Sequence, residues 1–259
     1  RDPDLARWIA DKGAFPCSMV DRIVPAATDA TRALASALIG VEDRLALETE
    51  PFMQWVIEDH FISGHPAWEA GGAIFAAHVD PYEKMKLRLL NGSHTLIAHL
   101  GLLNGLEYVR DVMAMPELVD QVHRHMKAVV PTLDPVPGID LEQYQRQLIE
   151  RFANKAIAHR NIQIAMDCSQ KLPQRIFAAA VETLAAGGDA AAFAHVVAVW
   201  MTVVRKRMDC DDPRRDEILA AARTIDPANP SASFFAIGGL FPPELVAARS
   251  WRDLVNTEL

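Results

Sequence analysis

From Pro81 to its C-terminus the chain is a series of helical patterns separated by prolines and glycines, and this series limits it to a mainly helical fold. The longest pattern, PYEKMKLRLLNGSHTLIAHLGLL, begins with Pro81, and proline is favoured in the first turn of a helix. Further helices are predicted at Glu117–Val129, Leu141–Phe152, Arg175–Ala186, Ala191–Arg207 and Arg214–Thr224.

The segment before Pro81 has a mixed pattern. Helices are predicted from Pro3 and over Thr28–Ile39. The run Phe15–Pro25 is short, apolar and interrupted by prolines, which predicts an extended strand or loop. Short strands are predicted at Leu45–Glu50 and Gln54–Ile57. The whole sequence therefore predicts a mainly α, multi-helical fold with a few short strands near its start.

Charge and apolar content exclude two classes of partner. The 259-residue chain has a formal net charge of −8, whereas a nucleic-acid-binding protein needs a basic face. No basic amphipathic stretch suggests a membrane surface. The apolar run Ala190–Val204 is too short to span a bilayer and is predicted to be a buried helix.

Cysteine usage points to a reducing compartment. The three cysteines (Cys17, Cys168 and Cys210) are odd in number and widely spaced, and no CxxC pair occurs. Neither a disulfide framework nor a zinc ribbon is indicated, so free thiols in the cytoplasm are expected. Because the chain starts at Arg1, without an initiator methionine, we expect it to be a piece of a longer polypeptide.

The glycines give no sign of a nucleotide-phosphate site. Adjacent glycines occur at Gly71-Gly72, Gly187-Gly188 and Gly238-Gly239, but no stretch has GxGxxG spacing. That spacing forms the turn that cradles a pyrophosphate in a Rossmann domain. The sequence alone therefore predicts that a dinucleotide-binding domain is absent.

Four polar residues gather on one side of the Pro81 helix. At about 100° per residue, with Lys86 as zero, Glu83 falls near ~60°, His94 near ~80° and Asn91 near ~140°. A lysine shielded from water can act as a base towards an alcohol, while Asn91 and His94 can donate hydrogen bonds to the developing alkoxide. Glu83 can relay the proton to solvent. Spacing alone favours the plainer alternative of an amphipathic helix with solvated charges, as we expect for Lys84 and Arg88.

Two other chemistries fit these residues poorly. His94 and His99 are five residues apart, which places them about 140° apart on a helix, whereas a helical zinc pair needs a spacing of four. His123 and His125 face different sides of their own helix. Ser93 and His94 are neighbours whose side chains diverge, so a nucleophilic serine is not indicated. No metal site is predicted.

Four strings are similar to the mannitol dehydrogenase family. They are FPCSMVDRIVPAAT (Phe15–Thr28), EPFMQWVIEDHF (Glu50–Phe61), PYEKMKLRLLNGSH (Pro81–His94) and QIAMDCSQKLPQRI (Gln163–Ile176). The resemblance implies a two-domain dehydrogenase. Residues 1–259 would then be its helical C-terminal substrate domain, inactive without the N-terminal Rossmann domain that binds most of NAD or NADP. No metal is implied.

The resemblance also implies roles for individual residues. Lys86 would be the general base and acid, Asn91 and His94 would hold the reacting oxygen, and Glu83 would relay the proton. Asp21 would lie at the interdomain cleft, near substrate and cofactor. Lys171 would contact the substrate. One departure is Cys168, which stands where relatives carry glycine, so the Asp167–Lys171 loop is expected to differ.

The implied substrates are linear polyols or sugar acids, in the pairs mannitol/fructose or mannonate/fructuronate. A sugar acid would need an extra cation, for which Lys171 and Arg160 are candidates. Arg160 fits a surface cation slightly better. The alternative function is a stand-alone, non-catalytic helical module that binds a sugar or another protein.

Overall fold

The computed structural model describes residues 2–259, which form two compact units. The first ends at Lys84 and the second covers Met85–Leu259. Where the sequence predicts a single domain over residues 1–259, the chain divides because each part has a core of its own. The first core lies on a small sheet and the second among helices.

The first unit contains a three-stranded mixed sheet with the order β1-β2-β3. β1 (Ser18–Asp21) runs antiparallel to β2 (Gln54–Glu58), which runs parallel to β3 (Ala73–Ala76). At the end of β1, Asp21 is opposite Gln54, and both side chains are buried. The unit also contains α1 (Pro3–Lys12), α2 (Asp29–Ile39) and the 3₁₀ turn η1 (Trp68–Gly71).

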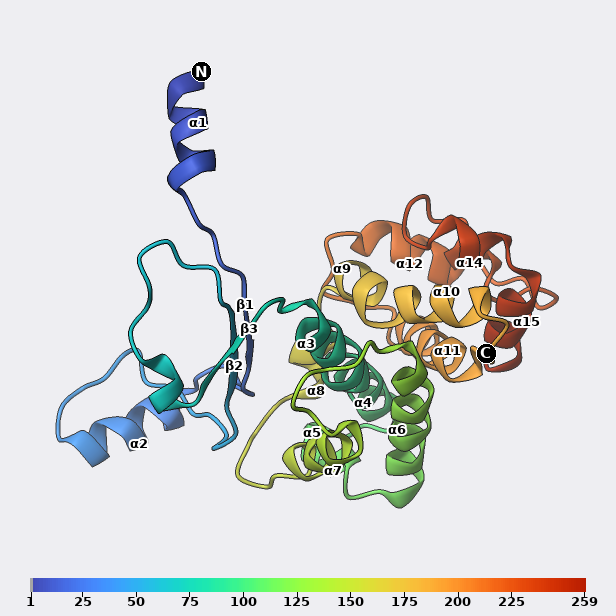
Figure 1. Cartoon of the computed structure of the whole chain (residues 1–259). Coiled ribbons are helices and arrows are strands. Elements are labelled where there is room, and N and C mark those ends of the chain that lie inside the picture. The colour runs from blue at the N-terminus through green and yellow to red at the C-terminus, as the bar shows by residue number, and fades with distance from the viewer. Residues whose placement is uncertain (1) are drawn as a thin grey trace. The chain divides into compact units, whose positions relative to one another are not determined.

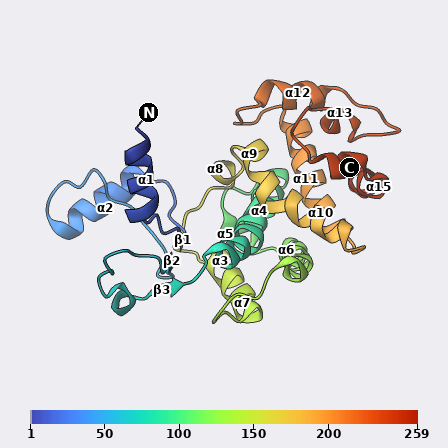
Figure 2. The same cartoon turned by 45° about the horizontal axis from the view of Figure 1, so that its top comes forward.

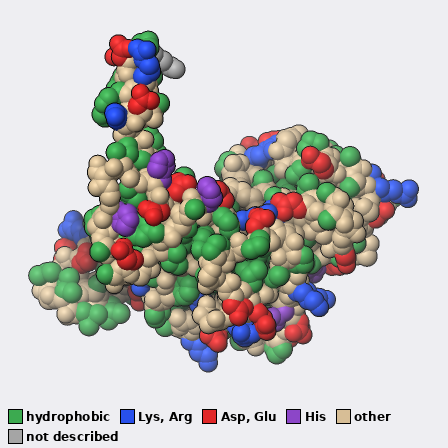
Figure 3. Space-filling view, in the orientation of Figure 1, with side chains coloured by type: hydrophobic (Ala, Val, Ile, Leu, Met, Phe, Trp, Pro, Cys, Tyr) green, Lys and Arg blue, Asp and Glu red, His purple; other side chains and the backbone are tan. Residues whose placement is uncertain are grey.

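The predicted strand at Leu45–Glu50 does not form. No strand pairs with this segment among the described residues, and the side chains of Leu45 and Leu47 point into solvent. Instead, the carboxylate of Glu50 accepts a hydrogen bond of 2.6 Å from the Ile23 N–H and holds the segment as a loop. Figure 3 shows apolar side chains on the outside of this unit, over α2.

The second unit is built around α4 (Gly92–Leu103), which contacts α5, α6, α8 and α11 (Figures 1 and 2). No helix among residues 2–259 has both the length and the apolar content needed to cross a bilayer. The other elements are α5 (Val109–Val112), α6 (Pro116–Val129), η3 (Val130–Thr132), α7 (Leu141–Phe152), α8 (Asn161–Ile164), α9 (Cys168–Leu172), η4 (Pro173–Phe177), α10 (Ala178–Ala185), α11 (Ala191–Arg207), α12 (Arg215–Arg223), α13 (Ala232–Phe235), α14 (Pro243–Ala247) and α15 (Arg249–Thr257).

Two glycines let α4 lie deep in this unit. A Cβ atom at Gly101 would stand 2.1 Å from Nδ2 of the buried Asn161, and one at Gly92 would stand 2.8 Å from Nε2 of His125. Glycine costs a helix about 1 kcal/mol relative to alanine. At these two positions the cost is offset because α8 and α6 can approach the helix backbone closely. All residues from Gly92 to Gly101 are buried as a result.

Candidate active site on the Lys86–His94 helix

The predicted helix from Pro81 contains a π-helical turn at the residues proposed for chemistry. α3 (Asp80–Met85) leads into the π turn η2 (Lys86–Asn91), which continues as α4. The N–H of Gly92 donates to the carbonyl of Leu87, five residues back. Residues five apart therefore lie one turn above each other. This corrects the angle of about 140° expected between Lys86 and Asn91 for an α-helix, and brings the two to the same side.

A second π turn packs against the first. η4 begins at Pro173, which has no N–H to donate, and its own closing bond runs from Ala178 to the Pro173 carbonyl. From η4, Nη1 of Arg175 donates to the Asn91 carbonyl at 3.4 Å and to Oγ1 of Thr95 at 3.2 Å. Oγ1 of Thr95 in turn donates to the Asn91 carbonyl at 3.0 Å. The end of the first turn is therefore fixed by the second.

His94 is the most constrained of the predicted site residues. Its ring is 4% exposed and packs 4.6 Å from the ring of Phe152 and edge-on to His159. Burial lowers the pKa of His94 well below its usual value, and the nearby His159 and Arg175 lower it further. The imidazole is therefore neutral near pH 7. Its buried Nε2 has no hydrogen-bond partner among residues 2–259. A buried, unsatisfied polar atom costs about 1–3 kcal/mol, so this nitrogen is well placed to bind a ligand oxygen.

Sequence reasoning missed Arg175, His159 and Phe152 as neighbours of this site. Arg175 lies in the QIAMDCSQKLPQRI string, in which only Lys171 was given a role. A cation in a run of apolar residues just after a helix-breaking proline is the signal that points to it. His159 and Phe152 have no such signal, because α7 and the loop after it meet α4 only in the folded chain.

The other predicted catalytic residues occupy the same helical run. Lys86 and Asn91 are half-buried at the two ends of η2, and Glu83 is exposed on α3. Asp21 belongs to the first unit, where it is buried at the end of β1. The structure thus brings Lys86, Asn91 and His94 together on one helix and supports them from η4.

The two predicted substrate cations have partners of their own. Nζ of Lys171 donates to the carbonyls of Met166 at 2.6 Å and Ile164 at 3.3 Å, and so holds the loop before α9. Burial lowers the pKa of Lys171 from its usual value. Arg160 pairs with Glu107 at 3.2 Å, and both side chains are more than half exposed. Their predicted contact with substrate stays a prediction.

The prediction that Arg88 is a solvated charge is wrong. Its side chain is 5% exposed and makes two hydrogen bonds of 2.6 Å to the carboxylate of Glu182 on α10. A third bond of 2.9 Å goes to the carbonyl of Thr132. Arg88 points inward because its partner, remote in sequence, approaches the inner side of η2. The pair anchors this turn to the helices behind it.

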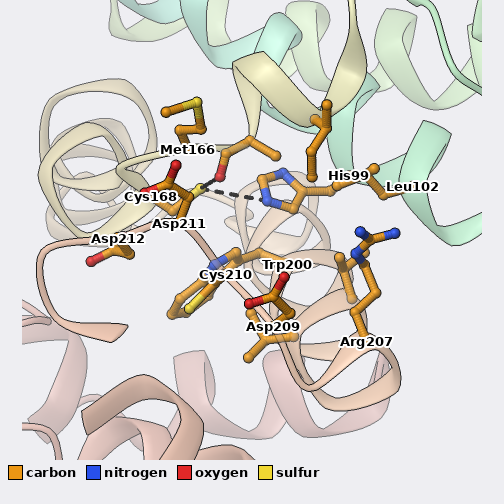
Figure 4. Close-up of a pocket in the computed structure, with 14 residues that line it drawn as sticks. His99, Leu102, Met166, Cys168, Trp200, Arg207, Asp209, Cys210, Asp211 and Asp212 are labelled. Carbon is orange, nitrogen blue, oxygen red and sulfur yellow. Dashed lines mark hydrogen bonds between the residues drawn. The ribbon is translucent and has the colours of Figure 1, made fainter. Parts of the chain in front are cut away.

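Further along α4, the side chains of His99 and Cys168 lie beside each other (Figure 4). Nδ1 of His99 donates to the Thr95 carbonyl at 2.6 Å, and Nε2 lies 3.5 Å from the Cys168 sulfur. Burial lowers the pKa of His99 to about 4 and raises that of Cys168 to about 12. Both groups are neutral near pH 7, so this is no thiolate nucleophile. The space beside them, about 30 Å³, has room for water but not for substrate.

The loop at Asp167–Lys171 has one unusual backbone conformation, at Asp167 rather than at Cys168, and its expected difference from relatives stays a prediction. Asp167 has a φ of 55° and adopts the left-handed conformation that favours glycine. Its N–H donates to the carbonyl of Asp211, which holds it there. Cys168 is the first residue of α9 and is buried against His99.

Buried histidines should make stability depend on pH. Burial lowers the pKa of His94, and it lowers those of His99 and His125 to about 4. As the pH falls, these histidines are protonated in the unfolded chain before they are protonated in the folded one. Their contribution to the free energy of unfolding is therefore complete above about pH 6.5 and decreases as the pH drops towards 4. Between pH 6.5 and 5 we expect His99 and His125 each to lower the unfolding free energy by about 1.5 kcal/mol.

Urea unfolding from pH 7 to 5 checks this pH dependence. His125→Gln should flatten the slope, while His123→Gln, which changes an exposed histidine on the same helix, should leave it unchanged. An equal slope in wild type and both variants would contradict the expectation.

Family models match nearly the whole chain. Residues 78–233 match the mannitol dehydrogenase C-terminal domain, and residues 1–70 match the mannitol dehydrogenase Rossmann domain. The prediction that no Rossmann domain is present is therefore wrong. It relied on the missing glycine fingerprint, but that fingerprint marks only the first βα turn of such a domain. Other strands of the domain carry no comparable mark.

Similar proteins and structures agree with these matches. The D-mannonate oxidoreductase of Escherichia coli (strain K12) is 42% identical over 95% of this chain, and a mannitol 2-dehydrogenase of Aspergillus terreus is 38% identical over 96%. The structure of Pseudomonas fluorescens mannitol 2-dehydrogenase, a ternary complex with NAD and D-mannitol, has a TM-score of 0.87 at 34% identity. It covers 98% of this chain.

This chain corresponds to only about half of each relative, so the similarity does not establish the activity of the whole protein. The chain spans 52% of the mannonate oxidoreductase, 49% of the Aspergillus enzyme and 53% of the Pseudomonas chain. All three relatives are oxidoreductases, which gives no support to a stand-alone, non-catalytic module. With one family model matching more than half of its residues, the chain belongs to the mannitol dehydrogenase family.

Proposed function

We propose that this chain carries the substrate site of an oxidoreductase that uses NAD or NADP to interconvert a secondary alcohol and a ketone on a linear polyol or sugar acid. The supporting observation is the neutral, buried His94 on the helix that also carries Lys86 and Asn91. Its Nε2 has no hydrogen-bond partner within the described part of the chain. The free thiols suit a cytoplasmic location.

Each residue of the helix has a distinct task in this proposal. In oxidation the neutral amine of Lys86 takes the hydroxyl proton, and in reduction the ammonium returns it to the carbonyl oxygen. Asn91 and His94 donate hydrogen bonds to that oxygen and stabilise its developing negative charge. Glu83, which is exposed, exchanges the proton with water.

The residues described here fit only part of a cofactor site. Residues 2–259 contain no glycine-rich turn between a strand and a helix, so they do not form a cradle for dinucleotide phosphates. A bound nicotinamide would accept or supply the hydride. Asp21, from its resemblance to family residues, is proposed to contact cofactor or substrate, and no other residue of this chain is assigned to the cofactor.

Between the two substrate classes, Arg175 favours a sugar acid. It lies beside His94, and only its Nη1 is bonded to protein among residues 2–259, which leaves other N–H groups for a carboxylate. Lys171 and Arg160 remain further candidates. Mannonate and fructuronate are accordingly the substrate pair we favour, with mannitol and fructose as the second.

Turnover of D-mannonate and D-mannitol by wild type and Arg175→Gln tests this proposal. We expect kcat/KM for mannonate to fall by about tenfold to a hundredfold more than kcat/KM for mannitol, because a charge-assisted bond to carboxylate is lost. Arg249→Gln, which removes an exposed arginine with no proposed role at the site, serves as the matched control. An equal loss on both substrates would make Arg175 a structural brace and leave the substrate class to the measured preference of the wild type.

A further inference from the structure

A pocket unrelated to the Lys86–His94 side chains lies within the second unit. It opens between α6 and the start of α11, beside Glu258 at the end of α15, and its volume is about 470 Å³. Pockets that bind small molecules span about 300–1,000 Å³. Its α6 wall is formed by residues 121, 124, 125 and 128, which share one helix face, and by Lys127 beside them. The pocket is large enough for a sugar-sized ligand.

The buried wall of this pocket contains the imidazole of His125, which has no hydrogen-bond partner in the described part of the chain. His125 is 1% exposed, and neither of its ring nitrogens has a hydrogen-bond partner among residues 2–259. The carbonyl of Arg88 approaches the ring without hydrogen-bond geometry. Burial lowers the pKa of His125 to about 4, so the ring is neutral and offers one donor and one acceptor. A ligand hydroxyl can donate to the unprotonated nitrogen or accept from the protonated one.

The mouth of the pocket has two cations, Arg124 and Lys127, and two acids, Asp189 and Glu258. Arg124 and Lys127 are exposed, and neither has an ion-pair partner in the described part of the chain. The two acids present are already engaged: Asp189 accepts from the Ala191 N–H at 2.9 Å, and Glu258 bonds His195 at 2.8 Å. The positive end of the 17-residue helix α11 also faces the pocket.

We propose that this pocket binds a small hydroxylated organic anion, with its oxyanion between Arg124 and Lys127 and a hydroxyl group on His125. The oxyanion is either the carboxylate of a sugar acid or the phosphate of a sugar phosphate. Both have the charge and the hydroxyl groups that these three side chains recognise.

This pocket also borders the back of the helix that carries the candidate site. Nε2 of His125 stands 2.8 Å from the position that a Cβ of Gly92 would take, and Gly92 directly follows Asn91. The side chain of His125 thus lies between a ligand in this pocket and the end of the π turn. Its binding does not depend on the proposed reaction, because no residue of the pocket belongs to that site.

Isothermal titration calorimetry of the protein with gluconate, glucose 6-phosphate and inorganic phosphate, each alone, tests the proposal. We expect saturable binding of gluconate or glucose 6-phosphate, and which of them binds identifies the oxyanion. The double variant Arg124→Ala/Lys127→Ala should weaken binding by about tenfold or more. The control Lys206→Ala/Arg223→Ala removes two other exposed cations and should leave the affinity unchanged.

Three outcomes would overturn the proposal. One is the absence of saturable binding by any of the three probes. Another is equal weakening in both double variants, which would mean attraction to net charge only. The third is loss of binding in Lys86→Ala, which would place the ligand at the candidate active site instead.

NMR of the imidazole nitrogens tests the contact with His125 directly. Saturation with the bound probe should shift the His125 nitrogen signals and leave those of the exposed His123 in place. Binding that moves neither signal would remove His125 from the site.

Discussion

Replacing Lys86 with alanine should lower the turnover number of the intact protein by about 10²- to 10⁴-fold, the usual contribution of a general base. The amine is the group proposed to take the alcohol proton, and alanine offers no replacement. Affinity for the nicotinamide cofactor, measured by fluorescence titration, should change little. Steady-state rates of oxidation, with urea unfolding to confirm an intact fold, provide the measurement.

Two further variants distinguish the loss of a proton acceptor at Lys86 from the loss of its positive charge. Lys86→Arg keeps the positive charge but cannot lose its proton near neutral pH, so it should be nearly as slow as Lys86→Ala. Lys84→Ala removes a lysine two residues earlier, on a different side of the helix, and should retain most activity. Lys86→Ala with a rate within tenfold of wild type would rule out Lys86 as the base.

Replacing Glu182 with glutamine should destabilise the protein by about 2–4 kcal/mol. The substitution keeps the shape of the side chain but removes the charge that pairs with Arg88, which is buried on η2. A buried guanidinium would then have only the Thr132 carbonyl and a neutral amide as partners. Because Glu182 itself is about half exposed, water can reach the pair from one side, so the loss should not exceed this range.

Urea unfolding at pH 7 measures this effect. Glu150→Gln, an exposed glutamate on α7, should change the unfolding free energy by no more than about 0.5 kcal/mol. Arg88→Met should cost less than Glu182→Gln, because the charge it leaves behind is partly solvated. A Glu182→Gln variant as stable as the Glu150 control would show that the ion pair does not anchor η2.

Long helices with local signals could be predicted almost to the residue. Leu141–Phe152 forms with the predicted bounds because Asp140 caps it and Tyr144, Leu148 and Phe152 recur every four residues on its buried side. The predicted buried helix over Ala191–Arg207 is confirmed as well. Both elements depend on features that lie within one or two helical turns of each other.

The π turns could not be predicted in the same way. A helical wheel assumes one rotation per residue, whereas η2 and η4 are wound more widely where they pack against each other. Gly92 and Pro173 are the local signs of this irregularity, but neither specifies its geometry. The sequence therefore predicted one helical run for Lys86, Asn91 and His94, as the structure has it, but misplaced Asn91 relative to Lys86, and the catalytic roles stay a prediction.

Other differences arise from partners that are remote in sequence. Arg88 has the pattern of a solvated charge until Glu182 comes beside it. Strand β3 (Ala73–Ala76) is too short to be recognised alone, and forms because β2 pairs with it. The Rossmann match over residues 1–70 has no glycine signature, so composition and motif spacing gave no indication of it.

An assay of the intact protein with D-mannonate and D-mannitol, each with NAD and with NADP, tests the central claim most directly. The proposal predicts cofactor reduction with at least one of these substrates, faster with mannonate, and its loss in Lys86→Ala. No cofactor reduction above background with either substrate, or reduction that survives the loss of Lys86, would contradict it.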